Sequence, residues 1–170
     1  DMYLNTPPDH SIPIVTMAVP SQDGDILTTV RVYKPLHISS NLPGLLYIHG
    51  GGYVLGFAAM GDAMCQQIVR EVNCIVVSVD YRLAPEHPFP AALSDCYNTL
   101  QWMADPQNGL NIDANNLAVA GGSAGGGLTA AVALMARDKG GPSLKFQMPL
   151  YPMIDDSNTS PSSYEITDSR

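Results

Sequence analysis

Positive charge is scarce in this chain. Eight Lys and Arg residues stand against 16 Asp and Glu residues, so the formal net charge at pH 7 is −8. An acidic balance of this size disfavours contact with nucleic-acid phosphates and with anionic lipid headgroups. We therefore expect neither nucleic acid nor an anionic membrane surface as a partner.

Cysteines are also few, and their spacing fits no common metal or disulfide pattern. Cys65, Cys74 and Cys96 are odd in number and form no C-x-x-C pair. This argues against a zinc site and against a disulfide framework, and it favours buried, reduced thiols in a cytoplasmic protein. Because the chain starts at Asp1 and not at a methionine, secretion stays open as an alternative.

Two further sequence signals are missing. No apolar run approaches the roughly 20 residues that a membrane-spanning helix needs, so we expect no membrane insertion. No Gly-Lys-Ser/Thr triplet occurs, which excludes a P-loop for nucleotide phosphates. With 170 residues the chain is long enough for one domain with a hydrophobic core and too short for two ordinary ones.

Apolar runs and turn signals alternate along the chain in a β/α rhythm. Residues 12–20 and 26–34 are rich in β-forming residues and flank an Asp-Gly turn signal, which predicts an antiparallel hairpin. Further strands are expected at 45–49, 74–79, 117–120 and 146–151, and helices at 58–72, 91–104 and 124–137. The pattern predicts one α/β domain over residues 1–170 with a mainly parallel sheet behind a leading hairpin.

The pentapeptide Gly121-Gly122-Ser123-Ala124-Gly125 lies between an apolar run and a helix-like stretch. A G-x-S-x-G sequence in this position predicts a sharp strand-to-helix turn that exposes the serine hydroxyl, as a nucleophile requires. The N–H of Ala124 and the positive end of the following helix would stabilise an oxyanion. The alternative is a glycine-rich turn that only permits close packing.

A second glycine-rich segment, His49-Gly50-Gly51-Gly52, follows the apolar run at 45–48. Residues without a Cβ atom let the backbone turn two N–H groups toward one point, which suits the second half of an oxyanion hole. We interpret His49 as an anchor of this loop and not as a proton carrier. The two segments together predict a serine acyl hydrolase.

Three segments in a fixed order resemble one known family. The chain carries His-Gly-Gly-Gly at 49–52, Tyr-Arg-Leu-Ala-Pro-Glu-His-Pro-Phe-Pro-Ala-Ala at 81–92 and Gly-x-Ser-Ala-Gly-Gly-Gly at 121–127. This is similar to the hormone-sensitive-lipase-like carboxylesterases (bacterial lipolytic family IV) of the α/β-hydrolase fold. The resemblance implies hydrolysis of short-chain acyl esters without a metal or organic cofactor. It also implies Ser123 as nucleophile and an oxyanion hole formed by the N–H groups of Gly51, Gly52 and Ala124, with His49, Gly50, Gly121 and Gly125 supporting them.

We assign the segment at 80–90, which follows a buried strand, a structural role beneath the site. Its prolines stiffen the path of the chain, and Arg82 could pair with Glu86 to pin it. The prolines also favour a surface loop around His87. A catalytic role for His87 is the minority alternative.

The chain departs from the family at three points. Gly122 stands where members usually carry Asp, or sometimes Thr, and this loosens the turn before the nucleophile. Few residues precede the first strand, where members usually carry a helical cap. Members also run to roughly twice a compact domain's typical length. We therefore expect the fold to be truncated after about the sixth strand, with most of the cap absent and the triad acid and histidine in a C-terminal segment beyond residue 170.

No histidine follows Ser123, although the triad order in this fold is serine, acid, histidine. Asp155 and Asp156 follow the expected sixth strand, where a few related hydrolases take their acid, but a cap boundary is the expected role here. Without a general base the serine is a weak nucleophile, so the 170-residue chain alone is expected to be inactive. The histidines present are His10, His37, His49 and His87.

Two alternatives to an N-terminal part of an esterase stay open. One is a non-catalytic small-molecule binder on the same fold, as in plant hormone receptors that resemble this family and lack the triad histidine. The other is a stable fragment, or one half of a nicked pair whose C-terminal segment is a separate piece. The sequence leaves the acyl and alcohol preference and the oligomeric state open.

Overall fold

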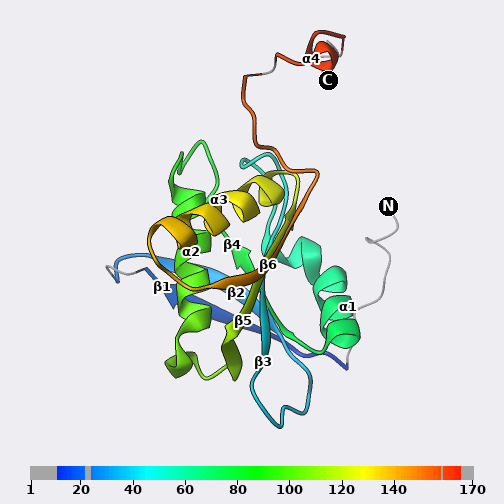
Figure 1. Cartoon of the computed structure of the whole chain (residues 1–170), viewed down its shortest axis with the longest axis vertical. Coiled ribbons are helices and arrows are strands. Elements are labelled where there is room, and N and C mark those ends of the chain that lie inside the picture. Colours follow the sequence, from blue (N-terminus) through cyan, green and yellow to red (C-terminus); the bar gives the residue numbers. More distant parts are fainter. Residues whose placement is uncertain (1–10, 22–23, 158, 166–170) are drawn as a thin grey trace.

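A six-stranded sheet runs through the middle of the molecule in the order β1-β2-β4-β3-β5-β6 (Figure 1). The computed structural model describes residues 11–21, 24–157 and 159–165, so His10 and Asp23 of the expected turn lie outside the described residues. The strands are β1 (Ile14–Pro20), β2 (Leu27–Tyr33), β3 (Leu42–Ile48), β4 (Ile75–Asp80), β5 (Ile112–Gly122) and β6 (Leu144–Leu150).

The pairing confirms the predicted hairpin and the mainly parallel sheet. β1 pairs with β2 and β2 pairs with β4 in antiparallel fashion, whereas β4, β3, β5 and β6 are parallel neighbours. β5 is longer than predicted, since it begins at Ile112 and includes the polar residues before Leu117.

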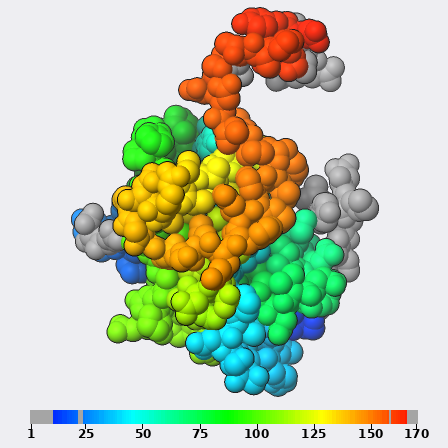
Figure 2. All heavy atoms as spheres, viewed as in Figure 1, coloured from blue at the N-terminus to red at the C-terminus, as the bar shows by residue number. Residues whose placement is uncertain are grey.

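Helices cover both faces of the sheet. α1 (Asp62–Val72) lies on one face, and α2 (Ala91–Ala104) and α3 (Ala124–Asp138) lie on the other (Figure 1). The helix expected over 58–72 begins as a 3₁₀ turn, η1 (Ala58–Gly61), and η2 (Pro106–Asn108) follows α2. After β6 the chain leaves the body and ends in the short α4 (Pro161–Glu165), which stands apart in the space-filling view (Figure 2).

Strand β4 shows how the sheet separates two hydrophobic clusters. Ile75, Val77 and Val79 belong to the cluster on the side of α2 and α3, whereas Val76 belongs to the cluster on the side of α1. A strand that is buried on both faces is apolar at most positions, and this explains the run at 75–79, in which Ser78 is the buried polar exception. The three free cysteines are buried as predicted, and burial raises the pKa of each thiol: Cys65, Cys74 and Cys96.

The register brings the ends of three strands to one edge. Ile48 at the end of β3 is paired with Gly121 of β5 on one side and with Val79 of β4 on the other. The carboxyl ends of parallel strands form the usual ligand-binding edge of an α/β sheet. The segments that leave β3, β4 and β5 therefore meet there.

Within the described ranges, no helix combines the length and the hydropathy required to cross a bilayer.

Candidate active site

Ser123 occupies a strained turn between β5 and α3. Its backbone angles are φ 57° and ψ −119°, a combination that residues with side chains rarely adopt. Backbone hydrogen bonds hold it there: the Ser123 N–H donates to the Leu150 carbonyl, and the Ser123 carbonyl accepts from the N–H groups of Gly127 and Met153, each at 3.0 Å. This is the geometry expected of a serine nucleophile elbow.

The glycines of the pentapeptide are required by close backbone packing. A Cβ atom on Gly121 would lie 2.5 Å from the carbonyl oxygens of Ile48 and Gly125. A Cβ on Gly125 would overlap the carbonyl oxygens of Ile48 and His49. The elbow therefore lies directly against the end of β3, which also carries the second glycine-rich segment.

That segment forms a loop over residues 49–57 with several left-handed residues. The φ angles are 126° at Gly51, 63° at Gly52 and 66° at Tyr53. The N–H groups of Val54 and Leu55 donate to the Gly51 carbonyl at 3.1 and 2.9 Å and close a tight turn. A Cβ on Gly51 would overlap the carbonyl of Leu55, so only glycine fits there.

The structure brings this loop and the elbow together. A Cβ on Gly50 would lie 3.0 Å from the Gly122 carbonyl oxygen and 3.4 Å from the Ser123 Cβ. Ala124 is the first residue of α3, where backbone N–H groups have no partner within the helix. The loop and the helix start are the two places from which donors could reach an oxyanion beside the Ser123 hydroxyl.

His49 is a buried, neutral part of the loop. Its side chain is 4% exposed, and its ring stacks on Tyr81 with centroids 4.2 Å apart and an interplanar angle of 13°. Nδ1 lies 2.7 Å from the Gly50 carbonyl oxygen; because a carbonyl only accepts, Nδ1 is the protonated nitrogen of this contact. Burial lowers the pKa of His49. Within the described residues Nε2 is buried without a hydrogen-bond partner, and this disfavours a charged ring further.

Arg82 pairs with Asp95 and not with Glu86, so the proposed local pair is wrong. The Arg82 Nη2 lies 2.9 Å from Asp95 Oδ1, and the Arg82 N–H donates to Asp95 Oδ2 at 2.9 Å. The Asp95 side chain on α2 is 1% exposed, and a buried carboxylate needs a charged partner. Glu86 is exposed and keeps its hydration. Sequence reasoning missed Asp95, which is an acidic residue among the buried residues of α2.

An apolar cavity of about 320 Å³ borders the site. Tyr53, which follows Gly52, and Gly127, which lies one turn after Ser123, form part of its wall. The remaining lining comes from the segment after β4, from the start of α2 and from α3, and includes Phe89, Leu93, Leu128 and Ala131. His87 is exposed on the surface loop that was predicted for it and also lines this cavity.

The position before Ser123 is packed against an aromatic ring. A Cβ on Gly122 would lie 3.1 Å from the hydroxyl and 3.2 Å from Cε2 of Tyr151. The Tyr151 ring thus lies where an aspartate side chain would begin.

Asp155 is exposed and accepts a hydrogen bond from the Ser157 N–H at 2.9 Å, which lowers its pKa. His37 is exposed as well.

With this geometry in place, comparison with known proteins is informative. The family profile described as the alpha/beta hydrolase fold matches residues 45–170. The chain belongs to the α/β-hydrolase family. This confirms the fold predicted from the three ordered segments, and curated relatives named carboxylesterase agree with the resemblance.

Two curated relatives of this hydrolase illustrate the match. Carboxylesterase NlhH of Mycobacterium tuberculosis is 44% identical over 151 residues, which cover 88% of this chain and 47% of that protein. An arylesterase of Saccharolobus solfataricus is 41% identical over 128 residues, covering 74% of this chain and 40% of that protein.

Solved structures show the same relation. A bacterial heroin esterase superposes with a TM-score of 0.90 at 36% identity, over 98% of this chain and 52% of that one. An esterase of the archaeon Pyrobaculum calidifontis superposes with a TM-score of 0.79 at 42% identity, over 89% of this chain and 47% of that one. The hydrolase chain spans about half the length of the proteins that it matches.

Proposed function

We propose that the full-length protein is a serine carboxylesterase that hydrolyses short-chain acyl esters through an acyl-enzyme on Ser123. The observation that carries this proposal is the strained Ser123 turn packed against the glycine loop at the start of α3. The N–H groups of Gly51, Gly52 and Ala124 are the proposed oxyanion donors. Relatives named as carboxylesterase and arylesterase support ester hydrolysis.

The reaction proceeds in two acyl transfers. The Ser123 Oγ attacks the ester carbonyl carbon while its proton passes to a general base, and the oxyanion that forms is held by the three N–H groups. The base returns the proton to the leaving alcohol as the ester C–O bond breaks. A water molecule then attacks the acyl-enzyme by the same route and releases the carboxylic acid.

The general base and its acid are proposed to lie C-terminal to residue 170. All four histidines of the chain precede Ser123, and His49 is buried and neutral against Tyr81. In this fold the triad runs serine, acid, histidine. The relatives extend well beyond the region that the chain matches.

The cavity beside Tyr53 and Gly127 supports the substrate class. Its volume of about 320 Å³ is near the lower end for ligand pockets, and its lining is largely apolar. Such a space suits a short, uncharged chain next to the ester carbonyl. A relative named ethyl acetate hydrolase from Pseudomonas putida, 36% identical over 152 residues, agrees with a short substrate.

The test is hydrolysis of p-nitrophenyl acetate and p-nitrophenyl butyrate by the full-length protein. Ser123→Ala should lower kcat by at least about 1,000-fold. Ser143→Ala, an exposed serine after α3, is the matched control and should leave kcat unchanged. Equal hydrolysis by the parent and Ser123→Ala would refute the nucleophile. Binding of an ester without turnover by the parent would favour the alternative of a non-catalytic binder.

A further inference from the structure

The loop that carries Gly51 and Gly52 cannot hold its own shape. Gly51, Gly52, Tyr53 and Gly56 all have φ angles between 63° and 126°, and each such residue is free to adopt other conformations once its surroundings relax. The internal turn at the Gly51 carbonyl fixes only the tip. The direction of the donor N–H groups therefore depends on contacts from outside the loop.

Those contacts come mainly from one segment, the end of β4 and the residues after it. The Tyr81 hydroxyl donates to the His49 carbonyl at 3.0 Å, and the Tyr81 ring stacks on the His49 ring. The Ala84 N–H donates to the Tyr53 carbonyl at 3.0 Å. These two hydrogen bonds hold the backbone on either side of the Gly50-Gly51-Gly52 triplet.

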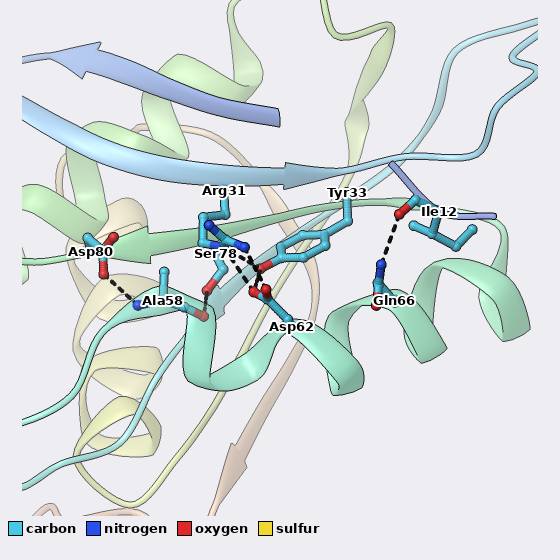
Figure 3. A network of polar contacts seen from close by, with 8 residues as sticks. All are labelled: Ile12, Arg31, Tyr33, Ala58, Asp62, Gln66, Ser78 and Asp80. Atoms are coloured by element: carbon cyan, nitrogen blue, oxygen red, sulfur yellow. Dashed lines mark hydrogen bonds and ion pairs between the residues drawn. The ribbon is translucent and has the colours of Figure 1, made fainter. Parts of the chain in front are cut away.

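A third contact holds the far end of the loop, where it enters η1. The Asp80 carboxylate accepts a hydrogen bond from the Ala58 N–H, and the Ser78 hydroxyl donates to the Ala58 carbonyl at 3.4 Å (Figure 3). Both polar groups of Ala58 are thus engaged by β4. Next to them, Asp62 at the start of α1 accepts hydrogen bonds from Arg31 and Tyr33 of β2 (Figure 3).

The segment that holds the loop, from the end of β4 to Ala84, is itself fixed by contacts with α2. Arg82, directly after Tyr81, is bound through its side chain and its N–H to the buried Asp95 of α2. Tyr81 is 3% exposed, and burial raises the pKa of its hydroxyl, so it remains a donor. The parallel register of β3 and β4 places the segment beside the loop, since Ile48 and Val79 are paired one residue before each segment begins.

We propose that Tyr81 and Asp80 are positioning residues of the esterase, which aim the Gly51 and Gly52 N–H groups at the oxyanion by holding the two ends of their loop. The proposal rests on the proposed function. Neither side chain touches the substrate. Their effect is specific to the transition state, because the oxyanion exists only there.

The test compares Tyr81→Phe and Asp80→Ala with the parent full-length protein, using p-nitrophenyl butyrate and a trifluoromethyl ketone whose adduct with the serine carries an oxyanion. Loss of a direct oxyanion donor costs about 100- to 1,000-fold in kcat, so an indirect loss should cost about 10-fold. KM should change less than about 2-fold, and the ketone should bind about 10-fold more weakly. Asp80→Asn keeps an acceptor oxygen for the Ala58 N–H and should restore most of kcat.

The matched control is Tyr97→Phe. Tyr97 is also a buried tyrosine, 4% exposed, but it lies on α2 beside Lys139. The Tyr97→Phe substitution should lower the melting temperature without changing kcat or the affinity for the trifluoromethyl ketone. Parental kcat and ketone affinity in both Tyr81→Phe and Asp80→Ala would overturn the proposal, as would equal losses in Tyr97→Phe.

A readout that does not need activity separates this proposal from the proposed function. Hydrogen exchange of the amides at residues 49–57 should be faster in Tyr81→Phe and in Asp80→Ala than in the parent, with α3 unchanged. If Ser123→Ala keeps full activity, the assignment of Ser123 as the nucleophile fails, and exchange at 49–57 still decides whether these side chains hold the loop. Parental exchange rates in both variants would overturn the proposal.

Discussion

The two halves of the site are held in different ways. The elbow around Ser123 is held through backbone groups. Glycines at 121 and 125 allow contact with β3, the Ser123 N–H donates to the Leu150 carbonyl, and the Ser123 carbonyl accepts from the N–H groups of Gly127 and Met153. The glycine-rich loop at 49–57, the proposed second half of the oxyanion hole, is held mainly by side chains of another segment, chiefly Tyr81 and Asp80. Both halves depend on residues that are distant in the sequence, but the elbow is held through backbone groups and the loop mainly through the side chains of Tyr81 and Asp80.

The elbow should tolerate change least. Gly125→Ala would force a Cβ against the carbonyl oxygens of Ile48 and His49, separating the elbow from β3. We expect a loss of at least about 100-fold in kcat from displacement of Ser123, the proposed nucleophile, and a loss of about 3 kcal/mol in the free energy of unfolding. Enzyme assays and urea denaturation of the full-length protein measure the two effects.

Gly140→Ala is the control for that substitution. Gly140 also has a positive φ of 60°, but a Cβ there meets nothing within 4 Å. Gly140→Ala should lower the free energy of unfolding by about 1 kcal/mol, the cost of placing an alanine in a left-handed backbone conformation, and should leave kcat unchanged. Similar losses of kcat in the two variants would contradict the packing argument for the elbow.

The support under the oxyanion loop should be the next most sensitive feature. Asp95→Ala leaves Arg82 without its carboxylate, and because the Arg82 side chain is 29% exposed and regains some hydration, we expect a cost of about 2 kcal/mol. Glu86→Ala, at the position first expected to pair with Arg82, should cost less than about 0.5 kcal/mol. Denaturant midpoints of the two variants decide between the partners, and the reverse order would refute the observed pair.

Acid should lower the free energy of unfolding through protonation of His49, which is buried in the glycine-rich loop. Burial lowers the pKa of folded His49, so the unfolded chain binds its proton more readily. The contribution of His49 to stability is complete above about pH 6.5, falls as the pH drops below that value, and levels off below the lowered folded pKa.

His49→Asn tests this pH dependence. Asn keeps a donor for the Gly50 carbonyl and does not titrate. Between about pH 7.5 and about pH 5 the melting temperature should therefore fall less in His49→Asn than in the parent. Parallel curves for the two proteins would show that His49 is not the titrating group.

The smallest effect is expected at Gly122, the residue before Ser123. Gly122→Asp introduces a side chain beside the Tyr151 ring, which is 78% exposed and can move aside. We expect a change within about 1 kcal/mol in stability. A larger loss, seen as a shift in the denaturant midpoint, would show that the Tyr151 ring is fixed against the elbow.

The same contrast explains which features could be predicted from sequence. The elbow, the hairpin and the parallel strands follow from short patterns: the glycines around Ser123, the turn signal and the apolar runs. The Arg82–Asp95 pair does not follow from such a pattern, because its partners are 13 residues apart and meet only when α2 packs beside the segment after β4, whereas spacing alone favours the nearer Glu86. The contacts of Tyr81 and Asp80 depend on the β3–β4 register, which no local pattern contains.

The most direct test of the account is to locate the acyl-enzyme. The full-length protein is mixed with p-nitrophenyl acetate, stopped with acid during turnover, digested and analysed by mass spectrometry. The account predicts an added acetyl group on the peptide that contains Ser123, and none on that peptide in Ser123→Ala. Turnover with the acetyl group on a different residue would contradict it. So would turnover in which the Ser123 peptide is neither acetylated by the ester nor phosphonylated in a parallel sample treated with a fluorophosphonate.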